Sequence, residues 1–166
     1  AENLSPNGFG AVVDIDLKGT FHCSKAALPY LKKHGGVVVN ISATLHYLGT
    51  PAQLHVASAK AGVDALTRVL AVEWGPYGVR VNGIAPGPIA DTEGVRRLLD
   101  DDAKRRAEQV TPLQRLGLVK DVSDAALFLC SGAAGYITGV TLVVDGGLWL
   151  TASGQLLASS PEVGAP

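Results

Sequence analysis

Charge imbalance and long apolar runs are both missing from this sequence of 166 residues. With 14 basic and 15 acidic residues, the formal net charge is −1, so the chain has no basic field to attract nucleic acid or an anionic membrane surface. The longest apolar runs, such as 36–39 and 140–144, are far shorter than the roughly 20 residues that span a bilayer. We therefore expect neither nucleic-acid binding nor a membrane span.

Cysteine is also scarce. Cys23 and Cys130 lie far apart, without CxxC spacing and without a histidine pair nearby. We expect two small buried thiols in a reducing compartment, with no disulfide framework and no metal site. The amino terminus has neither the positive nor the apolar segment of a signal peptide, and the sequence begins as though cut from a longer one.

Apolar residues, in contrast, make up 47% of the chain, which is the composition of one folded domain. Their helical spacing predicts the helices 8–33, 57–74, 93–109 and 121–129. Short β-branched runs predict the strands 37–42, 79–85 and 140–144. Gly19 and Pro29 should weaken or bend the first helix. The alternation of helices and strands predicts an α/β fold with a parallel sheet over 1–150, followed by a flexible tail over 151–166.

Ligands of an open α/β sheet bind beyond the carboxyl ends of its strands. The segments at those ends are Ser42 with its following loop, 86–92, and the turn 145–147. Lys60 lies near the start of the helix after the first of these loops. A lysine in that place can donate to the hydroxyls of a bound sugar.

Five motifs in register carry a resemblance to a known family. They are Val-Val-Asn-Ile-Ser at 38–42, Ser-Ala-Lys-Ala-Gly-Val at 58–63, Gly-Pro-Tyr-Gly-Val-Arg-Val-Asn at 75–82, Ala-Pro-Gly-Pro-Ile at 85–89, and Thr-Gly at 138–139 with Val-Asp-Gly-Gly at 144–147. Their order and spacing resemble the carboxyl-terminal half of the short-chain dehydrogenase/reductases. The resemblance implies part of a Rossmann-type doubly wound sheet, with three parallel strands and flanking helices but without the Gly-rich half that binds pyrophosphate.

Two positions depart from the usual Asn, Ser, Tyr and Lys active site of this family. Val56 stands four residues before Lys60, where the family has its tyrosine, and Asp16 stands where it has asparagine. Ordinary ketone chemistry is disfavoured, because no phenol is placed to exchange a proton with a substrate oxygen. Together with longer stretches such as 1–9 and 112–117, these departures resemble the 2,4-dienoyl-CoA reductases of the family, particularly the peroxisomal branch.

This closer resemblance implies NADPH-dependent reduction of a 2,4-dienoyl-CoA to the trans-3-enoyl-CoA. Asp16 would supply the proton through water from a desolvated helix kink, and Lys60 would hold the nicotinamide ribose. Ser58 would bond the thioester or dienolate oxygen. The expected cofactor contacts are Lys60, Pro86, Gly87, Ile89 and Thr92. The expected substrate contacts are Ser42, Ser58 and Arg97.

Several interpretations stay open. Tyr47 does not match the family's phenol position and is expected to be a loop aromatic, while His46 and His55 are expected to line the acyl pocket or to be exposed. The charged segment 93–108 is either a solvated helix or a mobile lid whose arginines, Arg97 among them, meet CoA phosphates.

The alternatives to a dienoyl-CoA reductase are a general short-chain reductase, such as a 3-ketoacyl reductase, and an inactive truncated partner. Helices 8–33 and 57–74 resemble the subunit-interface pair of the family, so a homo-oligomer is expected. The resemblance also implies the peroxisome, although the final residues 163–166 do not form a Ser-Lys-Leu signal, and the cytoplasm is the alternative. The sequence leaves the acyl chain length and the choice between NAD and NADP undecided.

Overall fold

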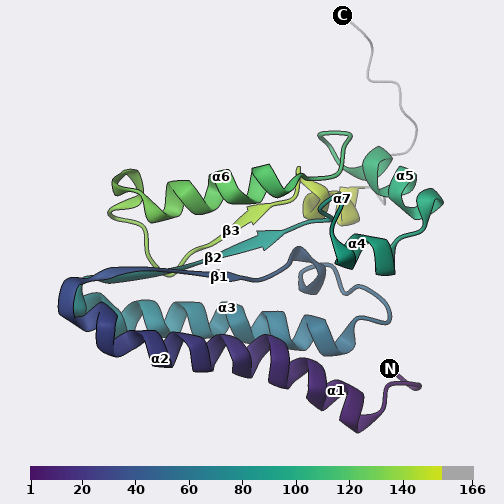
Figure 1. The fold of residues 1–166 in the computed structure, drawn as a ribbon. Coiled ribbons are helices and arrows are strands. Elements are labelled where there is room, and N and C mark those ends of the chain that lie inside the picture. Colours follow the sequence, from purple (N-terminus) through teal and green to yellow (C-terminus); the bar gives the residue numbers. More distant parts are fainter. Residues whose placement is uncertain (155–166) are drawn as a thin grey trace, which may run out of the picture.

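A computed structural model describes residues 1–154 as a three-stranded parallel sheet between two layers of helices (Figure 1). The strands are β1 (Gly36–Ile41), β2 (Val79–Pro86) and β3 (Thr141–Val144), in the spatial order β1-β2-β3. The helices are α1 (Pro6–Val12), α2 (Gly19–His34), α3 (Leu54–Trp74), α4 (Glu93–Leu98), α5 (Asp101–Val110), α6 (Val119–Cys130) and α7 (Leu148–Gly154). The predicted α/β class, strand order and parallel pairing are confirmed.

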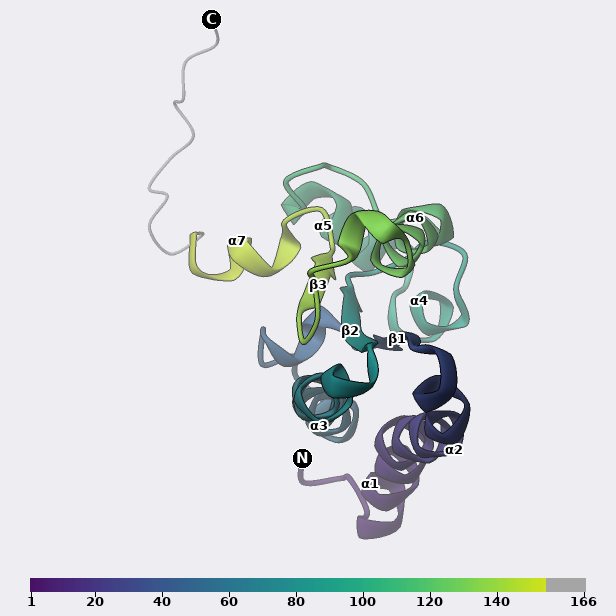
Figure 2. The same cartoon turned by 90° about the vertical axis from the view of Figure 1, so that its left-hand side faces the viewer.

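Helices α2 and α3 cover one face of the sheet, and α6 covers the other (Figures 1 and 2). The short helices α4, α5 and α7 gather near the carboxyl ends of the strands, which is where a ligand of such a sheet binds. Among the described residues, no helix combines the length and the apolar character needed to cross a bilayer. Helix α7 extends into the segment expected to be a tail, and 155–166 lie outside the described residues.

Strand β2 is the centre of the core, because helices lie on both of its faces. Val79 and Val81 are almost completely buried against Leu70 and Trp74 of α3. Burial of such side chains contributes about 1.5–3 kcal/mol each. The core therefore fixes α3 to the sheet, and with it the catalytic candidate Lys60.

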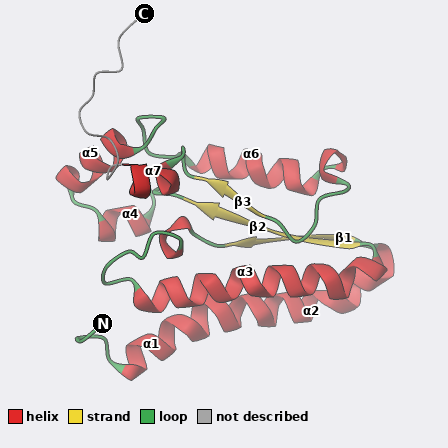
Figure 3. Ribbon diagram, turned by 180° about the vertical axis from the view of Figure 1, so that it is seen from behind, coloured by secondary structure: helices red, strands yellow, loops and turns green. Residues whose placement is uncertain are grey.

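The first predicted helix is interrupted at one of the two expected places, directly before Gly19. Between α1 and α2, residues Val13–Lys18 form a π-helical turn in which the Gly19 amide donates to the carbonyl oxygen of Asp14. Helix α2 instead continues through Pro29. Pro29 removes one backbone hydrogen bond, but Leu28 and Leu31 on either side pack against the core and hold the helix. Figure 3 shows α1 leading into α2 on the face that α3 also covers.

The prediction of one helix over 93–109 was wrong, because α4 and α5 are separate helices. Leu99 has an extended backbone (φ −124°, ψ 120°) and ends α4. Asp100 then begins α5, since its side chain accepts a hydrogen bond from the Ala103 amide at 2.7 Å. Thr92 caps α4 in the same way through the Val95 amide. These caps satisfy amides that a helix leaves unpaired at its start.

The expectation of buried thiols was also wrong, because both cysteines are exposed. Cys23 lies on α2 along a groove of about 530 Å³ beside β1, which no described segment covers. Cys130 is the last residue of α6, where Leu129 occupies the buried position instead. The helices predicted to form a subunit interface likewise expose apolar side chains, including Tyr30 of α2 and Val72 of α3. That interface stays a prediction.

One edge of β1 is open within the described part of the chain. The amides of Gly36 and Ser42 donate toward β2, to the carbonyl oxygens of Gly78 and Ile84. The backbone N–H and C=O groups of successive residues point to opposite sides of a strand. Those of the even-numbered residues of β1 therefore point to β2, and those of the odd-numbered residues point to the open edge.

We expect hydrogen exchange to distinguish these two sets of amides. Exchange measured by NMR should be about tenfold faster at Val37, Val39 and Ile41 than at Val38 and Asn40, because only the second set is hydrogen-bonded to β2. Equal protection of both sets would show that the edge is covered in solution.

Candidate active site

Lys60 and Asp16 lie together at the carboxyl end of β1. From α3, the Lys60 Nζ donates to the carbonyl oxygen of Ile41 at 3.1 Å. The same atom lies 3.9 Å from Oδ1 of Asp16, which projects from the π-helical turn. A π-turn within a helix is frequent at functional sites. The structure thus brings together the two residues that the sequence selected for proton transfer and cofactor contact.

The surroundings of Asp16 differ from the desolvated kink that we expected. Its side chain is 28% exposed and is paired with an ammonium group rather than enclosed by apolar residues. The cause is the wider π-turn, which presents Asp16 toward the open groove along β1 instead of into the core. Water can therefore reach the carboxylate.

The two serines have different settings. Ser42 is buried at the end of β1, where its Oγ donates to the backbone oxygen of Lys60 at 3.4 Å. Ser58 is exposed on the first turns of α3, and its Oγ donates to the backbone oxygen of Leu54 at 2.7 Å. For Ser58 to donate to a substrate oxygen, it must first release Leu54. Both substrate contacts stay predictions.

A partly buried polar cluster beside Lys60 was missed by the sequence interpretation. Oδ2 of Asp64, on α3, accepts a hydrogen bond from the Tyr47 hydroxyl at 2.8 Å and lies 3.1 Å from Nε2 of His46. The His46 side chain is only 10% exposed, so the alternative that it is exposed was wrong. One feature of the sequence could have indicated this cluster: Asp64 is the single charged residue within the apolar stretch 61–66.

This cluster does not form a nucleophilic relay. Ser42 and Asp64 both contact the same ring nitrogen of His46, Nε2, whereas a serine–histidine–acid triad uses the two ring nitrogens separately. Tyr47 is a loop aromatic, as expected, but its hydroxyl is directed to Asp64. His55 is half-buried, and its Nδ1 accepts from the Val56 amide at 2.9 Å.

The segment after β2 is closely packed. A side chain at Gly87 would meet Cβ of Asp145 at 2.7 Å, so glycine is required there by the contact with the turn after β3. The expected contact of Gly87 with the cofactor stays a prediction. The Thr92 hydroxyl donates to the carbonyl oxygen of Ile89 at 2.7 Å as well as capping α4. Within the described residues, the Ile89 amide donates no hydrogen bond.

An apolar cavity of about 550 Å³ lies between this segment, the loop 43–53 and the helices α4, α5 and α7. Its apolar lining includes Leu45, Leu48, Val95, Leu98 and Leu148. Arg97, on the exposed side of α4, is paired with Glu93 at 2.7 Å. The arrangement can hold an aliphatic chain, with charged groups near its outer wall.

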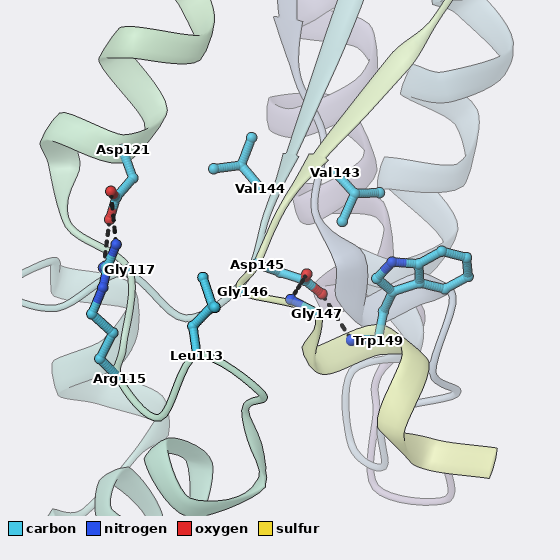
Figure 4. A pocket seen from close by; sticks show the side chains of 10 residues that line it. All are labelled: Leu113, Arg115, Gly117, Asp121, Val143, Val144, Asp145, Gly146, Gly147 and Trp149. Atoms are coloured by element: carbon cyan, nitrogen blue, oxygen red, sulfur yellow. Dashed lines mark hydrogen bonds and ion pairs between the residues drawn. The ribbon is translucent and has the colours of Figure 1, made fainter. Parts of the chain in front are cut away.

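A second, smaller cavity of about 330 Å³ adjoins the turn after β3 (Figure 4). On one side of it, Arg115 and Asp121 form a two-bonded ion pair, at 2.7 and 3.0 Å. On the other side, the Asp145 carboxylate accepts from the amides of Gly147 and Trp149, each at 2.8 Å. The charged groups that line this cavity are already partnered by residues of the described chain.

Comparisons with known proteins identify the family of this chain. A family model described as enoyl-(acyl carrier protein) reductase matches residues 1–149. The chain belongs to the short-chain dehydrogenase/reductase family. Within this family it is 54% identical over 147 residues to a peroxisomal 2,4-dienoyl-CoA reductase ((3E)-enoyl-CoA-producing) of Saccharomyces cerevisiae, covering 89% of this chain and 50% of that protein.

A peroxisomal 2,4-dienoyl-CoA reductase of Arabidopsis thaliana is 50% identical over 161 residues, covering 91% of this chain and 54% of that protein. Among solved structures of the family, a 3-oxoacyl-[acyl-carrier protein] reductase from Brucella melitensis with bound NAD is 35% identical, with a TM-score of 0.77. The match covers 90% of this chain and 55% of that one. This short-chain reductase chain spans about half the length of the curated relatives it matches.

Removal of the Tyr47 hydroxyl should change stability at high pH. Burial, and then the hydrogen bond and charge of Asp64, raise the pKa of Tyr47 above its ordinary value of 10.0. Since the folded state holds this proton more tightly than the unfolded state, Tyr47 contributes stability that is fully present below pH 10 and is lost as the pH rises further. Urea titrations above pH 10 should therefore show a steeper fall in unfolding free energy for the wild type than for Tyr47→Phe.

The control for this prediction is Tyr30→Phe, which removes an exposed phenol on α2. Its pH dependence should match that of the wild type. If the unfolding free energies of Tyr47→Phe and of the wild type fall equally steeply as the pH rises above 10, the phenol of Tyr47 is not held by Asp64.

Proposed function

We propose that this chain supplies the catalytic side of an NADPH-dependent 2,4-dienoyl-CoA reductase that produces the trans-3-enoyl-CoA. The observation that carries the proposal is the carboxylate of Asp16, 3.9 Å from the Lys60 ammonium, in a site where Val56 leaves no phenol. The similarity of about half of all residues to reductases of that name supports the same reaction class.

A nicotinamide cofactor fits the residues at the carboxyl ends of β1 and β2. Lys60 offers an ammonium for ribose hydroxyls, and the unpartnered amide of Ile89 offers a donor for the carboxamide. Pro86, Gly87 and Thr92 fix the path of the backbone that carries this amide. When bound, the reduced cofactor supplies a hydride. The choice of NADPH rests on the resemblance to dienoyl-CoA reductases.

The reaction requires a proton at a carbon atom rather than at a ketone oxygen. When the δ-carbon of the dienoyl thioester gains a hydride, an electron pair shifts to the thioester oxygen as a dienolate. Protonation of the α-carbon then gives the trans-3-enoyl-CoA. Asp16 is exposed enough to bind the water that delivers this proton, and Lys60 orients the carboxylate. Ser42 positions Lys60 through its backbone oxygen, and Ser58 is the candidate donor to the dienolate oxygen.

The acyl chain occupies the apolar cavity between the loop 43–53 and helices α4 and α5 in this proposal. Its aliphatic lining favours burial of methylene groups. Arg97, now paired with Glu93 on the surface of α4, is the candidate contact for CoA phosphates. On the same similarity we propose that the protein is peroxisomal and forms a homo-oligomer through the α1–α2 and α3 pair.

Asp16→Asn is the sharpest test of the chemistry. An amide has nearly the same shape as the carboxyl group but cannot deliver an acidic proton, so the turnover of 2,4-hexadienoyl-CoA should fall by about 10²–10⁴-fold, measured as NADPH oxidation. Asp14→Asn is the matched control, because Asp14 lies on the same π-turn but pairs with Lys18 at 2.6 Å on the exposed side. Turnover retained within a few-fold in Asp16→Asn, or turnover of a 3-ketoacyl-CoA by the wild type instead, would contradict the proposal.

Lys60→Ala should separate cofactor binding from proton delivery. Loss of the ammonium removes the ribose contact, so calorimetry should show NADPH binding weakened by about tenfold or more. Lys104→Ala removes a lysine that pairs with Asp101 on α5 and should bind NADPH like the wild type. Equal binding by both variants would show that the cofactor site has been assigned to the wrong end of the sheet.

A further inference from the structure

Asp64 joins α3 to the loop 43–53, which lines the proposed acyl site. It projects from α3, one helical turn after Lys60, and its Oδ2 holds both His46 and Tyr47 of the loop 43–53. The Asp64 side chain is only 6% exposed, and its other oxygen, Oδ1, has no hydrogen-bond partner among the described residues. A buried carboxylate with one unsatisfied oxygen is costly, so the two contacts through Oδ2 must be maintained for the fold to tolerate it.

The loop 43–53 has two sides with separate tasks. One side lines the apolar cavity, through residues that include Leu45, Leu48 and Pro51. The other side carries His46 and Tyr47, which face α3 and do not line the cavity. The contacts of His46 and Tyr47 with Asp64 therefore set the position of this wall of the cavity.

Tyr47 also contacts α7, which forms a second wall of the cavity. The ring of Tyr47 lies 4.1 Å from the ring of His46 and 5.8 Å from that of Trp149, measured between centroids. Trp149 belongs to α7, and its neighbour Leu148 lines the same cavity. Since Tyr47 belongs to the loop and its ring contacts Trp149, a movement of Tyr47 displaces both the loop and α7.

We infer that Asp64 is a positioning residue that, by holding His46 and Tyr47, fixes the loop 43–53 and α7 as walls of the acyl cavity and so determines which acyl chain lengths bind. Asp64 itself does not line the cavity. The identity of the occupant rests on the proposed function, whereas the positioning of the loop does not. A long acyl chain fills the cavity and depends on both walls, and a short chain depends on them less.

The test compares Asp64→Ala, Asp64→Asn and Tyr47→Phe with the wild type of this chain. Asp64→Ala removes both acceptors, Asp64→Asn keeps one acceptor oxygen, and Tyr47→Phe keeps the aromatic ring but removes its donor. Asp124→Ala is the control, because Asp124 is an exposed acid on α6 that pairs with Lys120. Two readouts are hydrogen exchange along the chain and calorimetric affinity for 2,4-hexadienoyl-CoA and 2,4-decadienoyl-CoA.

In Asp64→Ala, amide exchange over 43–53 should rise by about tenfold while exchange in α6 stays within about twofold of the wild type. The preference for the longer over the shorter acyl-CoA should fall by about fivefold. Asp64→Asn should change the exchange over 43–53 and the acyl-CoA preference less than Asp64→Ala does. Tyr47→Phe should change both in the same direction as Asp64→Ala, but less. Addition of Tyr47→Phe to Asp64→Ala should change little further, because the two side chains act through one contact.

A uniform rise in exchange along the described chain, or an equal loss of affinity for both acyl-CoAs, would overturn the inference, because either result indicates general destabilisation. Unchanged exchange over 43–53 would overturn it as well. If Asp64→Ala does not fold, Tyr47→Phe decides by the same criteria, since it leaves the ring packing intact. If the wild type binds neither acyl-CoA, the proposed function fails, and the exchange data alone confirm or refute the positioning.

Discussion

The junction between β1 and α3 is the constraint on which the site depends. Lys60 donates to the last carbonyl oxygen of β1, and Asn40 donates to Thr67 inside the core at 2.9 Å. Ser42 returns a hydrogen bond to the backbone of Lys60. Because Asn40, Ser42 and Thr67 are buried, α3 cannot slide along the strand without leaving polar groups unpaired. The distance between Asp16 and Lys60 follows from this fixed alignment.

The polar surface of the molecule is organised differently. Apart from the pair of Arg115 with Asp121, the ion pairs of α4, α5 and α6 connect residues three or four positions apart on one helix, as between Arg97 and Glu93 or Lys120 and Asp124. Such pairs favour each helix individually and do not attach it to the sheet. Helices α4 and α5 therefore owe their position mainly to side-chain packing at the apolar cavity, whereas α3 is held by buried hydrogen bonds.

Periodic patterns explain which parts of this architecture the sequence predicts. The strands are confirmed within one or two residues, because the β-branched runs are short and bounded by glycine or proline. Gly19 itself predicted a bend in the first helix, but the π-helical form of that bend and the break at Leu99 leave the apolar spacing almost unchanged, so neither was predicted. Lys60 and Asp16 could be selected from their places relative to the motifs. Asp64 could not, since its partners are separated from it by a loop whose course the sequence does not define.

The hydrogen bond from Lys60 to Ile41 also limits the sheet itself. Ile41 presents its carbonyl oxygen to the open side of β1, and the ammonium already occupies the place that a neighbouring amide would take. A further strand along this edge can pair with Val37 and Val39 but must diverge before Ile41. Divergence of two adjacent parallel strands creates a crevice at their carboxyl ends. Lys60 thus favours such a divergence at the place where its ammonium lies 3.9 Å from the Asp16 carboxylate.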